Sequence, residues 1–379
     1  MSIATVILPV VLAAALIGVL RYLARRVRSA APGESETSLL ATVLATIVAT
    51  LQSANQPQSS SMDQSSPAAP SQPREGSPRR ASAPTVDAPA SSAAHVEDAP
   101  TWGYQLQNLD LARAAASPFD IIVIDTTKDG SDDTVLTPSD VARLKRKPDG
   151  SPRQVLAYLS IGEAESYRSY WNTAWKRAKP EWLLGENPDW KENYAVCFWH
   201  PDWQRVMCGA PDARLDRILA AGFDGVYLDK CDVYDDLERR YKSTAASRPD
   251  IEGDMVELIA KLSRYAKARD PDFLIVMQNA EDLLERPDLR AILDGVAKEE
   301  LVYGADQPEK LNSTDDFRQC CRLLDLMRGD GKLVLVVEYL GDLGKIRHAV
   351  QAVSPLGYAL YISAKNRKLD RLEFDTLLA

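Results

Sequence analysis

The sequence predicts an α/β protein whose main domain is a (β/α)8 barrel, the TIM barrel. Two observations favour this fold: short apolar runs of strand length alternate with helical patterns, and they do so over about 280 residues. The runs are near-continuous stretches of Val, Ile and Leu, as expected of parallel strands that are buried on both faces. A doubly wound open sheet is the alternative, although the sequence lacks the glycine-rich phosphate-binding motifs of its nucleotide-binding forms.

Eight strand predictions follow one another along this domain. They are Trp102–Gln105, Ile121–Asp125, Val155–Ile161, Gly225–Asp229, Leu274–Gln278, Gly295–Glu299, Leu333–Glu338 and Gly357–Ile362. Helical patterns fall between many of them. One helix is expected to begin with Thr137 as N-cap and Pro138 at its first position, and another, over residues 213–221, is expected to stop at Gly222. A third is expected over residues 254–269, where apolar residues recur at helical spacing.

Two further zones precede the barrel domain, which we assign to residues 101–379. Residues 1–30 contain an uncharged apolar stretch from Ile3 to Leu20 that is about long enough to span a bilayer, and arginines follow it. Residues 31–100 contain a second, marginal apolar run at 38–51 and then a Ser-, Pro- and Ala-rich linker that is too poor in large apolar residues to fold. We therefore predict an N-terminal transmembrane helix joined to the barrel by a disordered linker.

The location of the barrel domain depends on the second apolar run. If both runs cross the membrane, the domain lies outside the cytoplasm. If only the first crosses, its arginine-rich flank leaves the domain in the cytoplasm. A cleaved signal peptide is a third interpretation, but its positive charges would precede the apolar stretch, and here they follow it. We favour a membrane-anchored protein with an extracytoplasmic catalytic domain.

The composition argues against several functional classes. A net charge of −9 and a pI near 5.1 disfavour nucleic acid as the main partner, because phosphate binding needs a basic surface. The sequence has only three histidines, so we expect neither a histidine-rich metal site nor a cofactor. Five cysteines are too few for a disulfide scaffold. Cys197 and Cys208 could pair in an exported domain, but we favour ordinary buried thiols.

Carboxylates stand where the apolar runs end. The positions are Asp125, Glu163, Asp229, Glu299 and Glu338. In a β/α barrel the carboxyl ends of the strands meet at one mouth, where active sites lie, so these acids are expected to share a pocket. A carboxylate in the position of Asp229 can attack a sugar carbon, or it can cap the next helix, and the position alone favours neither.

Glu299 is followed directly by Glu300. Alternation along a strand predicts that the two side chains point to opposite sides, so at most one reaches the pocket, and both can also be solvent-facing loop acids. An acidic rim with amides and aromatic rings is typical of sugar sites, because hydroxyls need acceptors and sugar rings stack on aromatic faces. The residues predicted to bind substrate on this rim are Trp102, Tyr104, Asp125, Glu163, Asp232, Gln278, Asn279, Tyr303, Glu338 and Tyr339.

Four segments of the barrel domain carry the motifs of a known family. They are Leu156–Glu165, Gly222–Asp229, Glu299–Tyr303 and Val336–Leu340. Together they resemble glycoside hydrolase family 114, which comprises the endo-α-1,4-polygalactosaminidases and their relatives. The resemblance implies a (β/α)8 barrel that cleaves α-linked galactosamine-containing polysaccharide by a retaining, two-carboxylate mechanism. It implies that Asp229 is the nucleophile and Glu299 the general acid/base. Val302 departs from the pattern, which has an aromatic residue there.

The resulting prediction is a membrane-tethered endo-glycosidase that acts on an amino-sugar polymer. Two alternatives stay open: a barrel that binds glycan without cutting it, and a metal-dependent lyase or aldolase whose acids hold Mg²⁺. Schiff-base chemistry would need a lysine at a strand end. Lys298 has that position, but alternation relative to Glu299 points it away from the pocket.

Overall fold

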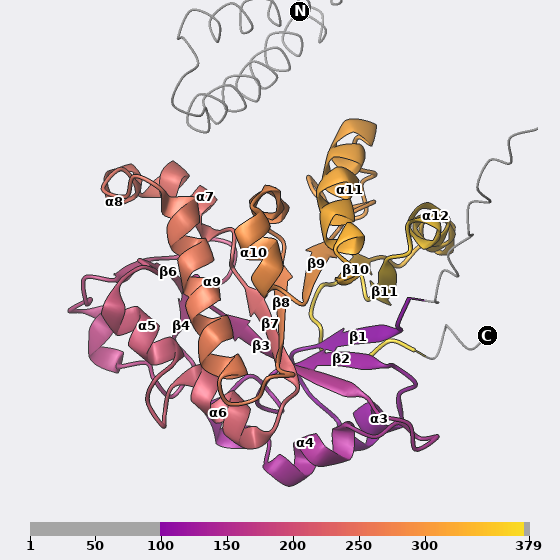
Figure 1. Cartoon of the computed structure of the whole chain (residues 1–379), viewed down its shortest axis with the longest axis horizontal. Helices are drawn as coiled ribbons and strands as arrows, with labels where there is room; N and C mark the ends of the chain where they lie inside the picture. Colours follow the sequence, from indigo (N-terminus) through magenta and orange to yellow (C-terminus); the bar gives the residue numbers. More distant parts are fainter. Residues whose placement is uncertain (1–98, 375–379) are drawn as a thin grey trace, which may run out of the picture. The chain divides into compact units, whose positions relative to one another are not determined.

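The computed structural model describes residues 99–374, and they form the barrel that the sequence predicts (Figure 1). Eight parallel strands make up one sheet, in the order β1-β2-β3-β7-β8-β9-β10-β11. The predicted strands are all present, with ends that shift by one or two residues. Their bounds are β1 (Trp102–Gln105), β2 (Ile121–Ile124), β3 (Gln154–Ser160), β7 (Gly225–Asp229), β8 (Leu274–Gln278), β9 (Gly295–Glu299), β10 (Leu333–Tyr339) and β11 (Ala359–Ser363).

The first and last strands lie next to each other and close the barrel. Within residues 99–374 no backbone ladder joins β1 to β11. The Trp102 indole N–H of β1 instead donates to the Ala359 carbonyl of β11 at 2.8 Å. Trp102 also packs against the rings of Tyr104, Tyr227 and Tyr361, which are buried inside the barrel. Because the sheet curls until its two edges touch, the open-sheet alternative is wrong.

The helices lie on the outside of the strands (Figure 1). The first predicted helix is confirmed as α4, where Thr137 and Asp140 form a reciprocal capping box. The second is confirmed as α6, which ends at Gly222 with φ 81°. The third, α9, begins three residues before the prediction, because Asp250 caps it by accepting from Gly253 N–H. The helix bounds are α3 (Leu111–Ala116), α4 (Pro138–Leu144), α5 (Pro201–Met207), α6 (Arg214–Ala221), α7 (Val233–Arg240), α8 (Lys242–Ala245), α9 (Ile251–Lys267), α10 (Pro287–Ile292), α11 (Thr314–Gly329) and α12 (Leu343–Val353).

An insertion between β3 and β7 contains a small antiparallel sheet that the sequence analysis does not predict. Its strands are β4 (Glu163–Glu165), β5 (Leu183–Glu186) and β6 (Asn193–Val196), in the order β4-β6-β5. These strands are too short to give a recognisable period. Trp203, which follows the insertion in α5, is fully buried and donates its indole N–H to the Ile161 carbonyl at 2.9 Å. This bond fixes the insertion to the carboxyl end of β3.

Gly162 allows the turn after β3 to press against the chain that follows β7. A Cβ at this position would lie 2.2 Å from the Lys230 carbonyl oxygen and 2.7 Å from a Val233 methyl carbon. We therefore expect Gly162→Ala to force the two segments apart and to lower the free energy of unfolding by about 1–3 kcal/mol. Urea denaturation measures this loss. A control at Gly329, where a Cβ meets nothing within 4 Å, should change stability much less, and equal effects would contradict the close-contact explanation.

Several predictions concern cysteines or the N-terminal zones. All five cysteines are buried and free, so the Cys197–Cys208 disulfide is not formed. The predicted transmembrane segment in 1–30 and the linker in 31–100 lie outside the described residues, apart from positions 99 and 100, and they stay predictions. Among the residues that the structure does describe, no helix is long and apolar enough to cross a membrane.

Candidate active site

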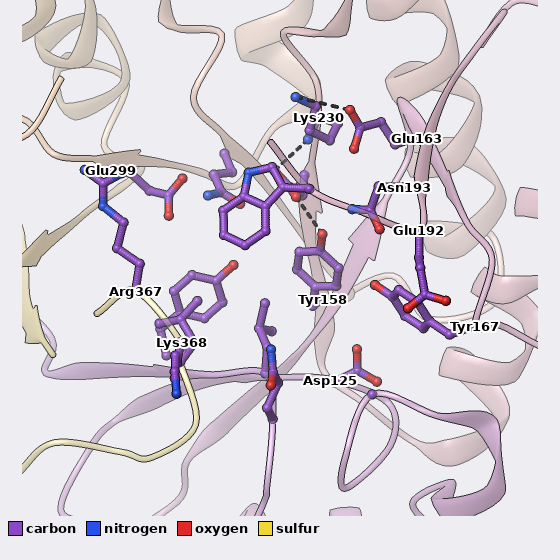
Figure 2. A pocket seen from close by; sticks show the side chains of 18 of the residues that line it. Asp125, Tyr158, Glu163, Tyr167, Glu192, Asn193, Lys230, Glu299, Arg367 and Lys368 are labelled. Carbon is purple, nitrogen blue, oxygen red and sulfur yellow. Dashed lines mark hydrogen bonds and ion pairs between the residues drawn. The ribbon is translucent and has the colours of Figure 1, made fainter. Parts of the chain in front are cut away.

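A cavity of about 640 Å³ opens at the carboxyl ends of the strands (Figure 2). Asp229, the last residue of β7, and Glu299, the last residue of β9, both line it. The strand order places β8 between them, so their carboxylates reach the same mouth from strands two apart. The charge of Glu299 is one of the causes that raise the pKa of Asp229, after burial. The structure therefore brings the two predicted catalytic residues together.

Asp229 is held in a fixed position by two donors. The Tyr158 hydroxyl donates to its Oδ2 at 2.6 Å, and the Lys230 backbone N–H donates to its Oδ1 at 2.7 Å. Burial raises the pKa of this carboxyl to about 7, against the lowering effects of Lys230 and of the Tyr158 hydrogen bond. Tyr158 lies in β3, which pairs with β7. This pairing places the Tyr158 hydroxyl beside Asp229.

Glu299 is oriented by residues of the two adjacent strands. From the β8 side, Asn279 donates its amide to Glu299 Oε2 at 3.2 Å and accepts from the Glu299 backbone N–H at 3.2 Å. From β10, the Tyr339 hydroxyl donates to Glu299 Oε1. Both partners were predicted to contact substrate. They line the cavity, and they also position the acid.

Glu300 corrects the expectation from strand alternation. Strand β9 ends at Glu299, and Glu300 takes a left-handed φ of 57°, so the side chain does not follow the alternation of the strand. Both glutamates therefore line the cavity. They differ in their partners, because Arg367 donates to Glu300 Oε1 and so neutralises it. Lys298, by contrast, does not line the cavity and pairs with Glu281 at 3.2 Å, as its predicted direction implies.

Most of the residues predicted to bind substrate line this cavity. They are Tyr104, Asp125, Glu163, Asp232, Gln278, Asn279 and Tyr339. Asp125 has its charge already satisfied, because the Arg168 guanidinium donates to its two oxygens at 2.9 and 2.6 Å. Arg168 also pairs with Glu165 at 2.9 Å, so one buried cation holds two buried carboxylates. Asp125 thus joins the inserted sheet to the barrel at the edge of the cavity.

Three other residues of that prediction lie outside the cavity lining, which corrects their expected role. Trp102 is 1% exposed and closes the barrel, as described above. Tyr303 lies beside α12, where its hydroxyl is 2.8 Å from His348 Nδ1. The sequence could not separate these rings from the pocket aromatics, because Trp102 lies on the same strand as Tyr104 and Tyr303 lies in the loop after β9.

Glu338 is the third residue outside the lining. It is fully buried, and its oxygens accept from the Val302 N–H at 2.7 Å and the Tyr303 N–H at 3.1 Å. Burial raises its pKa to about 7, although these hydrogen bonds lower it. Glu338 therefore ties down the loop that follows Glu299 and does not face the substrate. Val302 contributes only its backbone to this arrangement.

Several residues of the site were not predictable from the sequence. Tyr158 stands inside a recognised motif, but its buried strand position gave no sign of a polar role. The insertion contributes Tyr167, Trp190, Glu192 and Asn193. The segment after β11 contributes Arg367 and Lys368, which point into the cavity from its other side (Figure 2). Trp190 is 57% exposed, which is unusual for a large aromatic residue. No sequence pattern shows that this residue faces a cavity. Only the folded chain brings these segments to one mouth.

No cluster of three or more His, Cys, Asp or Glu side chains within residues 99–374 has a spacing that could hold a metal ion. The cavity instead combines carboxylates, amides and tyrosine hydroxyls with one exposed indole. Such a surface offers many acceptors for hydroxyl and amine donors, together with an aromatic face for a ring. Asp229 and Glu299, which both line it, supply the groups that acid/base and nucleophilic chemistry require.

Comparisons with known proteins bear on the family and the fold of this chain. A family model described as glycoside-hydrolase family GH114 matches residues 82–375. An uncharacterized protein of Methanocaldococcus jannaschii is 35% identical over 284 residues, which are 72% of this chain and 77% of that protein. One of Deinococcus radiodurans is 36% identical over 275 residues, 72% and 82% of the two chains. The glycoside hydrolase domain of PelA from Pseudomonas aeruginosa has the same fold, with a TM-score of 0.53 at 19% identity over 72% of this chain and 96% of that domain.

Proposed function

This chain belongs to glycoside hydrolase family GH114, and we propose that it is an endo-acting enzyme that cleaves α-linked galactosamine-containing polysaccharide. The observation that carries the proposal is the pair of carboxylates, Asp229 and Glu299, on one cavity. Glycoside hydrolysis needs two acids on either side of the scissile bond. The proposed enzyme needs no cofactor, because these two groups supply all the proton transfers and the covalent step.

In the proposed mechanism, Asp229 attacks the anomeric carbon while Glu299 gives its proton to the departing oxygen. The glycosidic bond breaks, and a glycosyl ester on Asp229 forms. Glu299, now ionised, takes a proton from a water molecule whose oxygen attacks the same carbon and frees Asp229. The retaining course is the one that the family resemblance implies, and the separation of the two carboxyls distinguishes it from an inverting course.

The charge of the cavity supports a cationic substrate. Eight acids line it: Asp125, Asp129, Glu163, Glu192, Asp229, Asp232, Glu299 and Glu300. Five bases line it: Arg168, Lys191, Lys230, Arg367 and Lys368. The excess of carboxylates attracts a polymer that carries ammonium groups. The exposed indole of Trp190 supplies a face on which the C–H side of a sugar ring can stack.

Turnover on defined polymers tests the proposal. The full-length protein is incubated with partly deacetylated α-1,4-linked galactosamine polymer, and reducing ends and chain length are followed together. An endo-acting enzyme shortens the chains early, before many reducing ends appear. Binding of the polymer with no new reducing ends would instead support the non-catalytic alternative. Loss of activity in a chelator would favour the metal-dependent one.

The pH dependence of activity follows from the pKa of Asp229. A nucleophile must be ionised, and the carboxyl of Asp229 has a pKa raised to about 7, so kcat/KM is expected to rise with pH through about 7. The Tyr158 hydrogen bond favours the ionised form and lowers that pKa. Tyr158→Phe should therefore move the acid limb of the profile to higher pH. An unchanged limb in this variant would show that another group controls it.

A further inference from the structure

A specificity residue for this site can be inferred from Glu163, and the inference rests on the proposed function. Glu163 begins β4, three residues after the end of β3. Strand β3 pairs with β7, and Ser160 of β3 stands opposite Asp229 in that register. Glu163 thus lies beside the strand that presents the nucleophile, and it lines the same cavity (Figure 2).

One oxygen of Glu163 is fully engaged and the other is not. Oε1 accepts from the Asn187 amide at 2.8 Å and lies 3.5 Å from Lys230 Nζ. Oε2 is buried and has no hydrogen-bond partner in the described chain, although the residue is only 1% exposed. An unpartnered buried carboxylate oxygen is costly, so it requires an explanation. A donor that arrives with the substrate supplies one.

A second acceptor shows the same feature on the other side of the nucleophile. Gln278 ends β8, the other neighbour of β7, and it lines the cavity. Its Oε1 is also buried without a partner. Asp229 therefore stands between two acceptors that lack donors. A ligand that carries donors on both sides of its reacting carbon fits this arrangement.

Charge distinguishes the two acceptors. Gln278 is neutral and fits a hydroxyl, whereas Glu163 is anionic. The nearby cation, Lys230, is shared between Glu163 at 3.5 Å and Asp236 at 3.7 Å, and it also interacts with Asp229 and Asp232. Four carboxylates thus face one ammonium group. The net charge at this corner of the cavity is therefore negative, which favours the binding of a further cation.

We propose that Glu163 Oε2 binds the protonated amine of the sugar unit that reacts with Asp229. In a 2-amino sugar the amine is on the carbon next to the anomeric centre, so it lies close to the residues that flank the nucleophile. An acetylated nitrogen carries no charge and brings only one donor with a bulky acyl group. Glu163 therefore makes the enzyme select units with a free amine at the position of cleavage.

The test compares matched oligosaccharides. Fully deacetylated and fully N-acetylated α-1,4-galactosamine oligomers of equal length are supplied to wild type and Glu163→Gln. The variant keeps an acceptor for Asn187 but loses the charge. We expect kcat/KM on the deacetylated oligomer to fall by about 10- to 100-fold, the usual effect of losing a charged hydrogen bond, and kcat/KM on the acetylated oligomer to stay within about threefold. An equal loss on both oligomers, or none on either, would overturn the proposal.

Asp236→Asn is the matched control. Asp236 also faces Lys230 but does not line the cavity, so the variant removes the same charge without touching the proposed amine contact. It should keep the preference for the deacetylated oligomer, and a loss equal to that of Glu163→Gln would assign the effect to Lys230.

A binding measurement separates this proposal from the proposed catalysis. Calorimetry is performed with galactosamine and N-acetylgalactosamine on wild type and on Glu163→Gln. We expect galactosamine to bind wild type at least tenfold more tightly, and the variant to lose that preference. If no oligomer is cleaved but this pattern appears, the hydrolase proposal fails and the amine site stands. Equal binding of the two sugars by wild type overturns the amine site, whatever the turnover.

Discussion

Asp229→Asn is expected to abolish glycoside hydrolysis, with kcat reduced by about four orders of magnitude or more, while the fold is retained. The single oxygen of the amide can still accept from one of the two donors, the Tyr158 hydroxyl or the Lys230 N–H, but the amide cannot attack the anomeric carbon. Glu299→Gln removes the proton donor and is expected to cost about 10²- to 10⁴-fold, which is the usual contribution of general acid catalysis. Steady-state rates with circular dichroism as a folding check measure both effects.

Glu300→Gln is the control that decides between the adjacent glutamates. Glu300 lines the same cavity but is paired with Arg367, whereas Glu299 is held by Asn279 and Tyr339. We expect the Glu300 variant to keep activity within about tenfold of wild type, since it loses an ion pair and not the acid. If Glu300→Gln is the inactive variant and Glu299→Gln is active, the acid is Glu300.

Arg168→Met is expected to destabilise the domain by about 3–5 kcal/mol. The guanidinium is almost fully buried and serves Asp125 from the barrel and Glu165 from the inserted sheet. Its removal leaves two carboxylates buried without a cation, and the desolvation cost of those charges is then no longer offset. Equilibrium unfolding in urea gives the change in free energy.

Arg217→Met is the matched control for Arg168→Met. Arg217 pairs with Asp132 at 3.0 Å, but its side chain is 29% exposed, and Asp132 keeps a second partner in Arg214 at 3.2 Å. The control should cost no more than about 1 kcal/mol, as partly exposed ion pairs do. If both variants lose the same small amount, the buried network has no special part in holding the insertion on the barrel.

Most of the strands could be predicted because they are apolar runs that end in a turn. Val155–Leu159 and Val334–Val337, for example, have no polar residue that would confuse a strand with a helix. Asp229 and Glu299 were predictable for the same reason, since each is the first acid after such a run and the barrel delivers strand ends to one place. The same reasoning assigned Glu338 to the substrate, although its carboxylate binds two backbone N–H groups.

Other residues of the site are brought together by tertiary contacts, and no local sequence pattern predicts those contacts. Arg367 lies beyond the last strand and 67 residues from Glu300, its partner. Arg168 stands in a connection whose short strands have no clear period, and it meets Asp125 across 43 residues. Trp102 and Tyr104 are two residues apart and face the same side of one strand, yet only Tyr104 reaches the cavity. Their depth along the barrel decides this, and sequence spacing does not report depth.

The pocket draws side chains from both ends of the domain, from Tyr104 in the first strand to Arg367 and Lys368 after the last. A nascent chain that has emerged from the ribosome only as far as β10 has neither Arg367 to neutralise Glu300 nor the strand that closes the barrel against Trp102. We therefore expect a polypeptide that ends before β11 to be inactive, because its barrel is not closed. The pocket is therefore complete only after β11 and the segment that follows it have been synthesised.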